Sequence, residues 1–270
     1  MAALRILVTG ATGFLGGHVT SALRARGHIV LCASRSAGDA AVDLAAASMV
    51  AAVVQATAPD LVLNLAARSR LIDCERDPEA ARSINAEVPE QFALRFGARL
   101  LHVSTDLVFD GRSAPYAETS PVGPLSTYGA TKAEGEERVL QHAGRVVRLP
   151  LLFGPDHRGR GASASLRAAI VVGERCPMFT NEYRTPLHAA DAASALADLV
   201  VDPTGPQLLH LPGPERCSRW EFARRLCAQQ QLDASLLVPV ECQDPVRPRD
   251  VSLIGGWRAG RSLDEMLGSA

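Results

Sequence analysis

A short apolar run leads directly into three evenly spaced glycines near the start of the chain. Residues 4–8 favour a β-strand, Gly10, Gly13 and Gly16 follow, and 14–26 has the pattern of a helix. Glycine allows a tight turn and a close approach of the backbone, and the N–H groups at a helix N-terminus attract phosphate. Because strand, glycine turn and helix come in this order, the segment predicts a diphosphate-binding loop. A glycine-rich turn without a ligand is the alternative.

The alternation of strand and helix continues over the first 150 residues. We expect strands at 29–33, 61–65, 100–103 and 146–149, and helices at 44–56, 78–96 and 127–142. Strands that are apolar throughout indicate a parallel sheet covered on both faces, and right-handed crossovers give a doubly wound α/β fold, the Rossmann fold. We predict a dinucleotide-binding domain at 1–150, to which helix 187–200 returns. Residues 151–270 should form most of a smaller C-terminal, substrate-binding lobe.

Charge and composition restrict the partners of the chain. The formal net charge is -1 and the sequence pI is about 6.7, which argues against nucleic acid or an anionic membrane as a partner. The six cysteines and seven histidines are scattered without metal-ligand spacing, so we expect no metal. A strand begins almost at Met1 and no apolar run is long enough to cross a bilayer. We therefore expect a cytoplasmic protein with reduced thiols.

Lysine occurs once among the 28 basic residues, at Lys132, four positions after Tyr128. Residues i and i+4 share a face of a helix, so the two side chains can act together. An ammonium beside a phenol stabilises the phenolate and lowers a pKa that is ordinarily near 10. Arginine cannot release its proton, whereas the pKa of lysine moves readily. The pair predicts acid–base chemistry, and two ordinary surface residues are the alternative.

The end of the second expected strand bears on the type of cofactor. Chains that bind NAD usually carry an acid there for the ribose 2′-hydroxyl, but this chain has Ser34 and Arg35. A guanidinium pairs well with a phosphate, so NADP(H) is favoured over NAD(H). Arg35 could also be an ordinary surface arginine. Asp43, which follows the strand, could contact the adenine or face water.

Three ordered motifs carry a resemblance to a known family. They are the glycine loop, Asn64-Leu65-Ala66-Ala67, and Ser104-Thr105-Asp106 ahead of Tyr128-Gly129-Ala130-Thr131-Lys132. With Val108-Phe109-Asp110-Gly111 and Pro115-Tyr116-Ala117-Glu118, they resemble the extended short-chain dehydrogenase/reductase family and, within it, the dTDP-4-dehydrorhamnose reductase branch. The likeness covers about 4–200 well and the remainder loosely.

The resemblance implies an enzyme that reduces a ketone with a nicotinamide cofactor. Thr105 would hold the substrate carbonyl oxygen, Tyr128 would donate a proton to it, and Lys132 would bind the nicotinamide ribose and depress the tyrosine pKa. Asp106 and Arg184 would join Thr105 and Tyr128 in contacting the substrate. The expected cofactor contacts are Gly10, Thr12, Gly13, Phe14, Leu15, Gly16, Ser34, Arg35, Asp43, Leu44, Asn64, Ala66, Ala67, Ser104, Tyr128 and Lys132.

The substrate is less constrained than the chemistry. Leu107 follows the Ser-Thr-Asp triplet where reductases of this branch tend to have an aromatic residue. A nucleotide-linked 4-keto-6-deoxysugar is the leading substrate class, and a ketone from secondary metabolism is the alternative. The motifs also resemble the methionine adenosyltransferase beta subunit, so a dinucleotide-binding regulatory subunit stays open. Helices 78–96 and 127–142 could form the seam of a homodimer.

Overall fold

The computed structural model describes residues 2–34, 40–41, 44, 49–156 and 158–270, and it divides the chain into two compact units. The first unit comprises Met1–Val108, Ser126–Arg148 and Ala193–Leu209. The second comprises Phe109–Leu125, Leu149–Ala192 and His210–Ala270. Unlike a single boundary at residue 150, this division places 109–125 in the second unit. The chain also returns to the first unit at Ala193, within the helix expected at 187–200.

A seven-stranded sheet forms the centre of the first unit, in the order β11-β6-β5-β4-β1-β2-β3. Its strands are β1 (Arg5–Thr9), β2 (Ile29–Ser34), β3 (Ala40–Ala41), β4 (Leu61–Asn64), β5 (Leu100–Thr105), β6 (Arg145–Leu149) and β11 (Leu208–His210). The pairings of β1 with β2 and β4, of β2 with β3, and of β4 with β5 are parallel. The strand order reverses at β1, which is the switch point where doubly wound sheets bind their ligands. The predicted Rossmann fold is confirmed.

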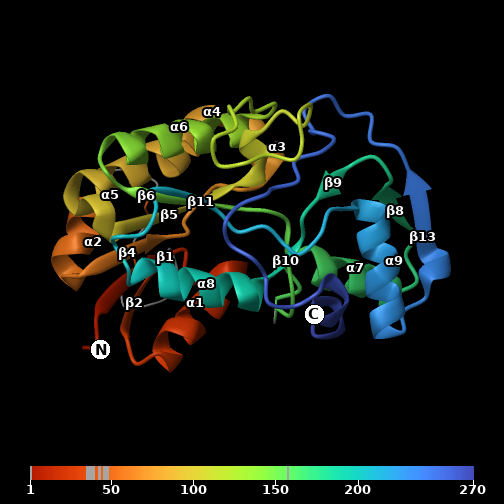
Figure 1. Cartoon of the computed structure of the whole chain (residues 1–270), viewed down its shortest axis with the longest axis horizontal. Helices are drawn as coiled ribbons and strands as arrows, with labels where there is room; N and C mark the ends of the chain where they lie inside the picture. The colour runs from red at the N-terminus through yellow and green to blue at the C-terminus, as the bar shows by residue number, and fades with distance from the viewer. Residues whose placement is uncertain (1, 35–39, 42–43, 45–48, 157) are drawn as a thin grey trace. The chain divides into compact units, whose positions relative to one another are not determined.

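Helices cover both faces of this sheet, with α5 and α6 on one face and α1 and α8 on the other (Figure 1). The helices are α1 (Phe14–Ala25), α2 (Met49–Thr57), α3 (Leu71–Arg76), α4 (Pro78–Arg82), α5 (Val88–Phe96), α6 (Thr127–Gln141) and α8 (Ala189–Val200). A π turn, η1 (Ser83–Glu87), joins α4 to α5, and the 3-10 turns η2 (Gly97–Arg99) and η3 (Asp106–Val108) flank β5. The expected helix 78–96 is thus helical throughout but contains a π turn.

The register of the sheet places polar residues in a row across three strands. Leu7 of β1, Val62 of β4 and Leu100 of β5 are buried in the hydrophobic core that α2, α5 and α6 cover. Side chains alternate between the faces of a strand, so residues two positions further on point to the same side. Those residues are Thr9, Asn64 and His102, and the register pairs Thr9 with Asn64 and Asn64 with His102. Three polar side chains therefore follow the apolar row toward the carboxyl ends of the strands.

The second unit contains short strands and three helices among its described residues. These elements are β7 (Leu152–Phe153), α7 (Ala162–Val171), β8 (Cys176–Phe179), β9 (Tyr183–Arg184), β10 (Leu187–His188), β12 (Cys217–Ser218), α9 (Arg219–Gln230), η4 (Ala234–Leu236), β13 (Leu237–Val240) and α10 (Leu263–Gly268). The strands pair as β7 with β10, β9 with β12, and β8 with β13. The segment 178–186 therefore contains residues of two strands, β8 and β9. Ser218 and Glu221 form a capping box at the start of α9.

Candidate active site

The glycine loop between β1 and α1 is shaped by close backbone contacts. Gly10 has a φ of +65°, and a Cβ there would lie 3.0 Å from the backbone nitrogen of Ala66. A Cβ on Gly16 would lie 2.3 Å from the carbonyl oxygen of Gly10. Gly13 is the N-cap of α1 and has no side chain to occupy the space before the helix. The loop therefore has the form expected of an anion cradle, with glycine required at positions 10 and 16.

The other residues expected at the cofactor have mixed environments. Thr12, Phe14 and Leu15 are half-buried at the start of α1, and the buried Ser34 ends β2. Leu44 is a core residue, so any contact with a cofactor would involve its backbone or the small exposed part of its side chain. Arg35 and Asp43 lie outside the described residues, and their roles stay predictions.

The carboxyl end of β5 presents one hydroxyl outward and one inward. Thr105 is half-buried, and its hydroxyl accepts a hydrogen bond from the backbone N–H of Leu107 at 3.2 Å and donates to the Asp106 carboxylate at 3.2 Å. Ser104 is buried, and its hydroxyl has no hydrogen-bond partner within the part of the chain that is described. Thr105 is thus the better placed of the two to reach a bound molecule. After β4, Asn64 is fully buried, Ala66 is half-buried and Ala67 is exposed.

Helix α6 carries Tyr128 and Lys132, and its position is fixed at its N-terminus and near its middle. Its N-cap is Ser126, whose hydroxyl accepts a hydrogen bond from the N–H of Gly129 at 3.1 Å. Further along, a Cβ on Gly135 would lie 2.2 Å from the carbonyl oxygen of Asn85 in η1, so the two backbones touch. Tyr128 is half-buried on the first turn of this helix.

Lys132 is almost completely buried, at 1% exposure, and its ammonium group turns toward β5. Its Nζ atom lies 2.7 Å from the carbonyl oxygen of Val103 and 2.9 Å from Nε2 of His102. Burial lowers the pKa of Lys132 from its ordinary value of 10.5 to about 7, and the Glu136 carboxylate opposes this shift. A lysine with such a pKa can change its charge near neutral pH, which no arginine can do. Sequence alone indicated the shared face, but not the degree of burial.

A buried ion pair stands one turn further along α6. Glu136 accepts hydrogen bonds from Arg148 of β6, the shortest at 2.6 Å, and both side chains are at most 4% exposed. The pair holds the carboxylate that acts on Lys132 in a fixed place. It was not expected from the sequence, because the two residues are separated by twelve positions and belong to different elements.

His102 is a second residue of the site that the sequence did not single out. It is fully buried between Asn64, at 2.9 Å from Nδ1, and Lys132. Burial and then the nearby Lys132 charge lower the pKa of His102 well below its ordinary value of 6.5, so the ring is neutral at physiological pH. A histidine within the otherwise apolar 100–103 run was the available signal.

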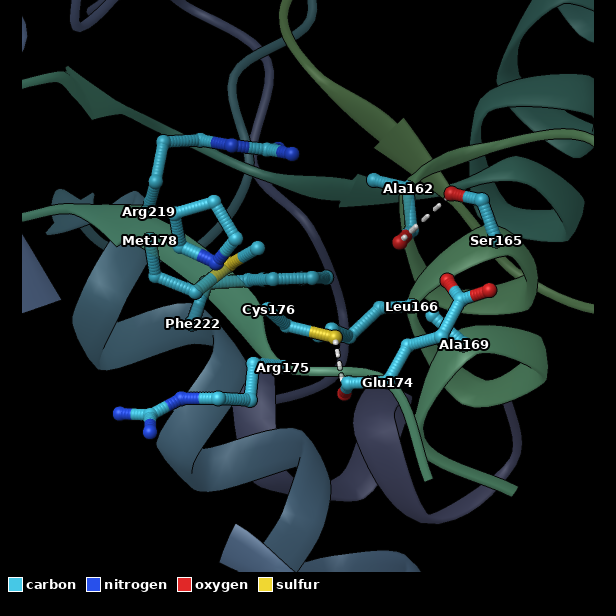
Figure 2. Close-up of a pocket in the computed structure, with 11 residues that line it drawn as sticks. Ala162, Ser165, Leu166, Ala169, Glu174, Arg175, Cys176, Met178, Arg219 and Phe222 are labelled. Carbon is cyan, nitrogen blue, oxygen red and sulfur yellow. Dashed lines mark hydrogen bonds between the residues drawn. The ribbon is translucent and has the colours of Figure 1, made fainter. Parts of the chain in front are cut away.

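Arg184, expected at the substrate, belongs to β9 of the second unit. It is 7% exposed and lies 3.5 Å from the Glu182 carboxylate. The second unit also has a cavity of about 250 Å³ between α7, β8 and α9 (Figure 2). Arg219 borders this cavity with Met178 and Phe222, and its buried Nη1 atom has no hydrogen-bond partner among the described residues. The cavity offers an apolar wall, two cations, Arg219 and Arg175, and the carboxylate of Glu174.

No group of three or more histidine, cysteine, aspartate or glutamate side chains among the described residues could hold a metal ion. No described helix is both long and apolar enough to cross a membrane.

The switch point at β1, the glycine loop and the Tyr128–Lys132 helix define an extended short-chain dehydrogenase/reductase, a class of nicotinamide-dependent oxidoreductases. Within this class, the chain belongs to the family described as RmlD substrate binding domain, whose model matches residues 4–252. The family predicted from the sequence is confirmed.

Individual relatives include both a subunit of a transferase and solved reductases. The chain is 30% identical to methionine adenosyltransferase 2 subunit beta of Bos taurus over 266 residues, which cover 92% of this chain and 80% of the relative. A dTDP-4-dehydrorhamnose reductase structure from Clostridium acetobutylicum has a TM-score of 0.87 and 25% identity, covering 98% of this chain and 97% of that one. A dTDP-4-dehydrorhamnose reductase structure from Bacillus anthracis, solved in complex with NADP, has a TM-score of 0.88 and 23% identity, with 98% of each chain covered.

Proposed function

We propose that this protein is an NADPH-dependent reductase that converts the ketone of a nucleotide-linked 4-keto-6-deoxysugar into an alcohol. The observation that carries the proposal is Lys132, a buried lysine with a pKa near 7, on the same helical face as Tyr128. The NADP bound to the Bacillus anthracis reductase supports the choice of cofactor. The glycine loop, closed against Ala66 at the switch point, would hold its diphosphate.

The residues at the ends of β5 and α6 can perform the proton transfer of such a reaction. The bound nicotinamide would supply the hydride to the carbonyl carbon. The Thr105 hydroxyl would donate a hydrogen bond to the carbonyl oxygen, and Tyr128 would transfer its phenolic proton to that oxygen as negative charge develops there. The charged form of Lys132 would stabilise the phenolate that remains. Tyr128 would then regain a proton from solvent.

The second unit supports an anionic substrate. The Arg219 guanidinium is buried at the edge of the cavity with a donor atom unsatisfied among the described residues, and buried donors ordinarily find a partner. A phosphate group of a sugar nucleotide would supply that partner, because guanidinium matches phosphate in geometry and charge. Arg219→Gln should therefore raise KM for a nucleotide-linked keto sugar more than it lowers kcat. An unchanged KM would remove this support.

A cofactor titration followed by a substrate panel tests the proposal. The purified protein would be titrated with NADPH and NADH, and then mixed with keto-sugar nucleotides and with unrelated ketones while nicotinamide absorbance is followed. Arg35→Ala should weaken NADPH roughly 10- to 100-fold and NADH little, because one charged hydrogen-bond partner of the 2′-phosphate is lost. Arg95→Ala, which removes an exposed arginine that bonds within α5, serves as the control. Equal effects of Arg35→Ala on both cofactors would refute the NADP assignment.

The likeness to the methionine adenosyltransferase beta subunit supports a second candidate, a dinucleotide-binding regulatory subunit. Such a protein would bind the cofactor without oxidising it in the presence of any ketone. Reduction of unrelated ketones alone would instead favour a secondary-metabolite reductase. A homodimer through α5 and α6 also stays a proposal, and sedimentation of the purified protein would test it.

A further inference from the structure

Four buried side chains form a continuous line of hydrogen bonds from the glycine loop to α6. Thr9 contacts Asn64 at 2.5 Å, Asn64 contacts His102 at 2.9 Å, and His102 contacts Lys132 at 2.9 Å. Thr9, Asn64 and His102 are paired in register across β1, β4 and β5, and no member of the line is more than 1% exposed. Because these side chains are shielded from water, each polar hydrogen within the line must be donated to a neighbouring side chain of the line.

The direction of the line is set at Thr9. Its hydroxyl oxygen accepts hydrogen bonds from the backbone N–H groups of Leu65 at 3.2 Å and Ala66 at 3.1 Å. A hydroxyl has two acceptor positions and one hydrogen, so the hydrogen of Thr9 points to the oxygen of Asn64. The amide of Asn64 consequently presents its oxygen to Thr9 and its NH₂ group to His102.

The direction continues through the imidazole ring. The NH₂ group of Asn64 can only donate, so Nδ1 of His102 must accept. A neutral imidazole carries one hydrogen, which is then on Nε2 and points to Nζ of Lys132. Nζ can accept it only as a neutral amine, while one of its own hydrogens serves the carbonyl oxygen of Val103.

We propose that His102 is a positioning residue whose tautomer is coupled to the charge of Lys132, so that the line Thr9–Asn64–His102 selects the neutral amine in the free protein. An ammonium at Lys132 must donate to Nε2, which moves the ring hydrogen to Nδ1. Nδ1–H then needs the oxygen of Asn64, so the amide rotates by half a turn and turns its NH₂ group toward Thr9, whose two acceptor positions are already filled by the N–H groups of Leu65 and Ala66. The net change is the uptake of one proton: the two hydrogen bonds of His102 reverse, and the one between Thr9 and Asn64 is lost.

The remaining charges around Lys132 favour the reversed state. Glu136, on the same helix, raises the pKa of Lys132, although its paired Arg148 of β6 offsets part of that effect. Tyr128 lies on the shared face of α6. Burial lowers the pKa of Lys132, and the line acts in the same direction, against Glu136. The far end of the line is the backbone at Leu65 and Ala66, against which Gly10 packs, so the charge of Lys132 is linked to the glycine loop.

Nuclear magnetic resonance of the free, full chain tests this coupling directly. The chain has one lysine, so ¹⁵N-lysine labelling yields one side-chain signal besides the backbone, and ¹⁵N-histidine labelling reports which ring nitrogen carries the hydrogen. His102→Gln identifies the His102 signals among the seven histidines. We expect Lys132 to titrate with a pKa of about 7 and the His102 hydrogen to move from Nδ1 to Nε2 over the same range as pH rises. A ring hydrogen that stays on one nitrogen throughout that titration would overturn the proposal.

A pair of threonine variants tests the role of Thr9. Thr9→Val removes the hydroxyl that fixes Asn64, so the amide can rotate freely and the proton affinity of Lys132 should rise about tenfold. Thr57→Val removes another buried hydroxyl, which bonds to the Val53 carbonyl, and should leave Lys132 unchanged. The same Lys132 midpoint in both variants would contradict the proposal.

The inference rests on the proposed function in one point only, namely that the charged form of Lys132 stabilises the phenolate of Tyr128. The resonance measurements need neither cofactor nor substrate, so they can succeed when no ketone is reduced. Conversely, a reductase whose His102 tautomer is constant would keep the proposed function and lose this inference.

Discussion

Replacing Lys132 by methionine would show how strongly the fold opposes a charge at this position. Methionine keeps most of the length of the side chain but cannot titrate. The loss of the hydrogen bonds to Val103 and His102 affects stability equally at every pH above the range where His102 titrates. The pH-dependent part of the difference between the two proteins therefore belongs to the lysine amine.

The sign and size of this pH-dependent stability difference follow from the pKa of Lys132, which burial lowers from 10.5 to about 7. Between these two values the unfolded chain holds the proton and the folded chain releases it, so the stability of the native protein rises with pH. The destabilisation is fully present below pH 7 and disappears as pH approaches the unfolded value. From pH 7 to pH 9 the folded state gains about 2 kcal/mol relative to the unfolded state.

Urea unfolding of both proteins at pH 7 and pH 9, with equal ionic strength, would measure this quantity. We expect the free energy of unfolding of the native protein, minus that of Lys132→Met, to rise by about 2 kcal/mol. The other titrating groups are common to both proteins and cancel in the difference. A difference that stays constant within about 0.5 kcal/mol would show that Lys132 titrates at an ordinary pKa, and one that falls would show a raised pKa; either result refutes the reasoning.

Three further substitutions test the site. Gly16→Ala should abolish cofactor binding in a titration, because its Cβ would lie 2.3 Å from a backbone oxygen, whereas Gly17→Ala, which meets nothing within 4 Å, should bind normally and unfold at a higher temperature. Glu136→Gln should cost about 3–5 kcal/mol in urea unfolding because it leaves the Arg148 cation buried without its carboxylate, and a loss below about 1 kcal/mol would contradict a buried ion pair. Tyr128→Phe should lower turnover roughly 10²- to 10⁴-fold while cofactor affinity is kept, and near-normal turnover would exclude it as the proton donor.

The sequence was sufficient for the fold where local signals agree. The apolar run of β1, the glycines after it and Gly27 and Gly97 at positive φ behind two helices all marked elements that the structure contains. Strands β8 and β13 were missed, because β8 contains a proline and the two strands pair only with each other, about sixty residues apart. Such pairing depends on tertiary contacts and produces no periodic pattern of apolar residues in the sequence.

The candidate site was predictable as a set of residues but not as a network. The spacing of Tyr128 and Lys132 indicated a shared helical face, and Thr105 followed from the strand that ends before it. The burial of Lys132 and the part played by His102 follow from the register of β4 and β5, which one sequence does not reveal. A polar residue within an apolar strand can be a satisfied core residue or part of a site, and only its partners distinguish the two.

The contact between η1 and α6 has a consequence for how this fold can vary. The wider π turn carries the Asn85 carbonyl to 2.2 Å from the place where a side chain at position 135 would begin. The wide turn in one segment and the glycine in the other are therefore complementary, and neither should change alone without disturbing the contact. Deleting one residue from that turn would withdraw the carbonyl, and a side chain at 135 would then be tolerated. The helix that carries Tyr128 and Lys132 is thus located by backbone shape, which ordinary surface mutation cannot alter.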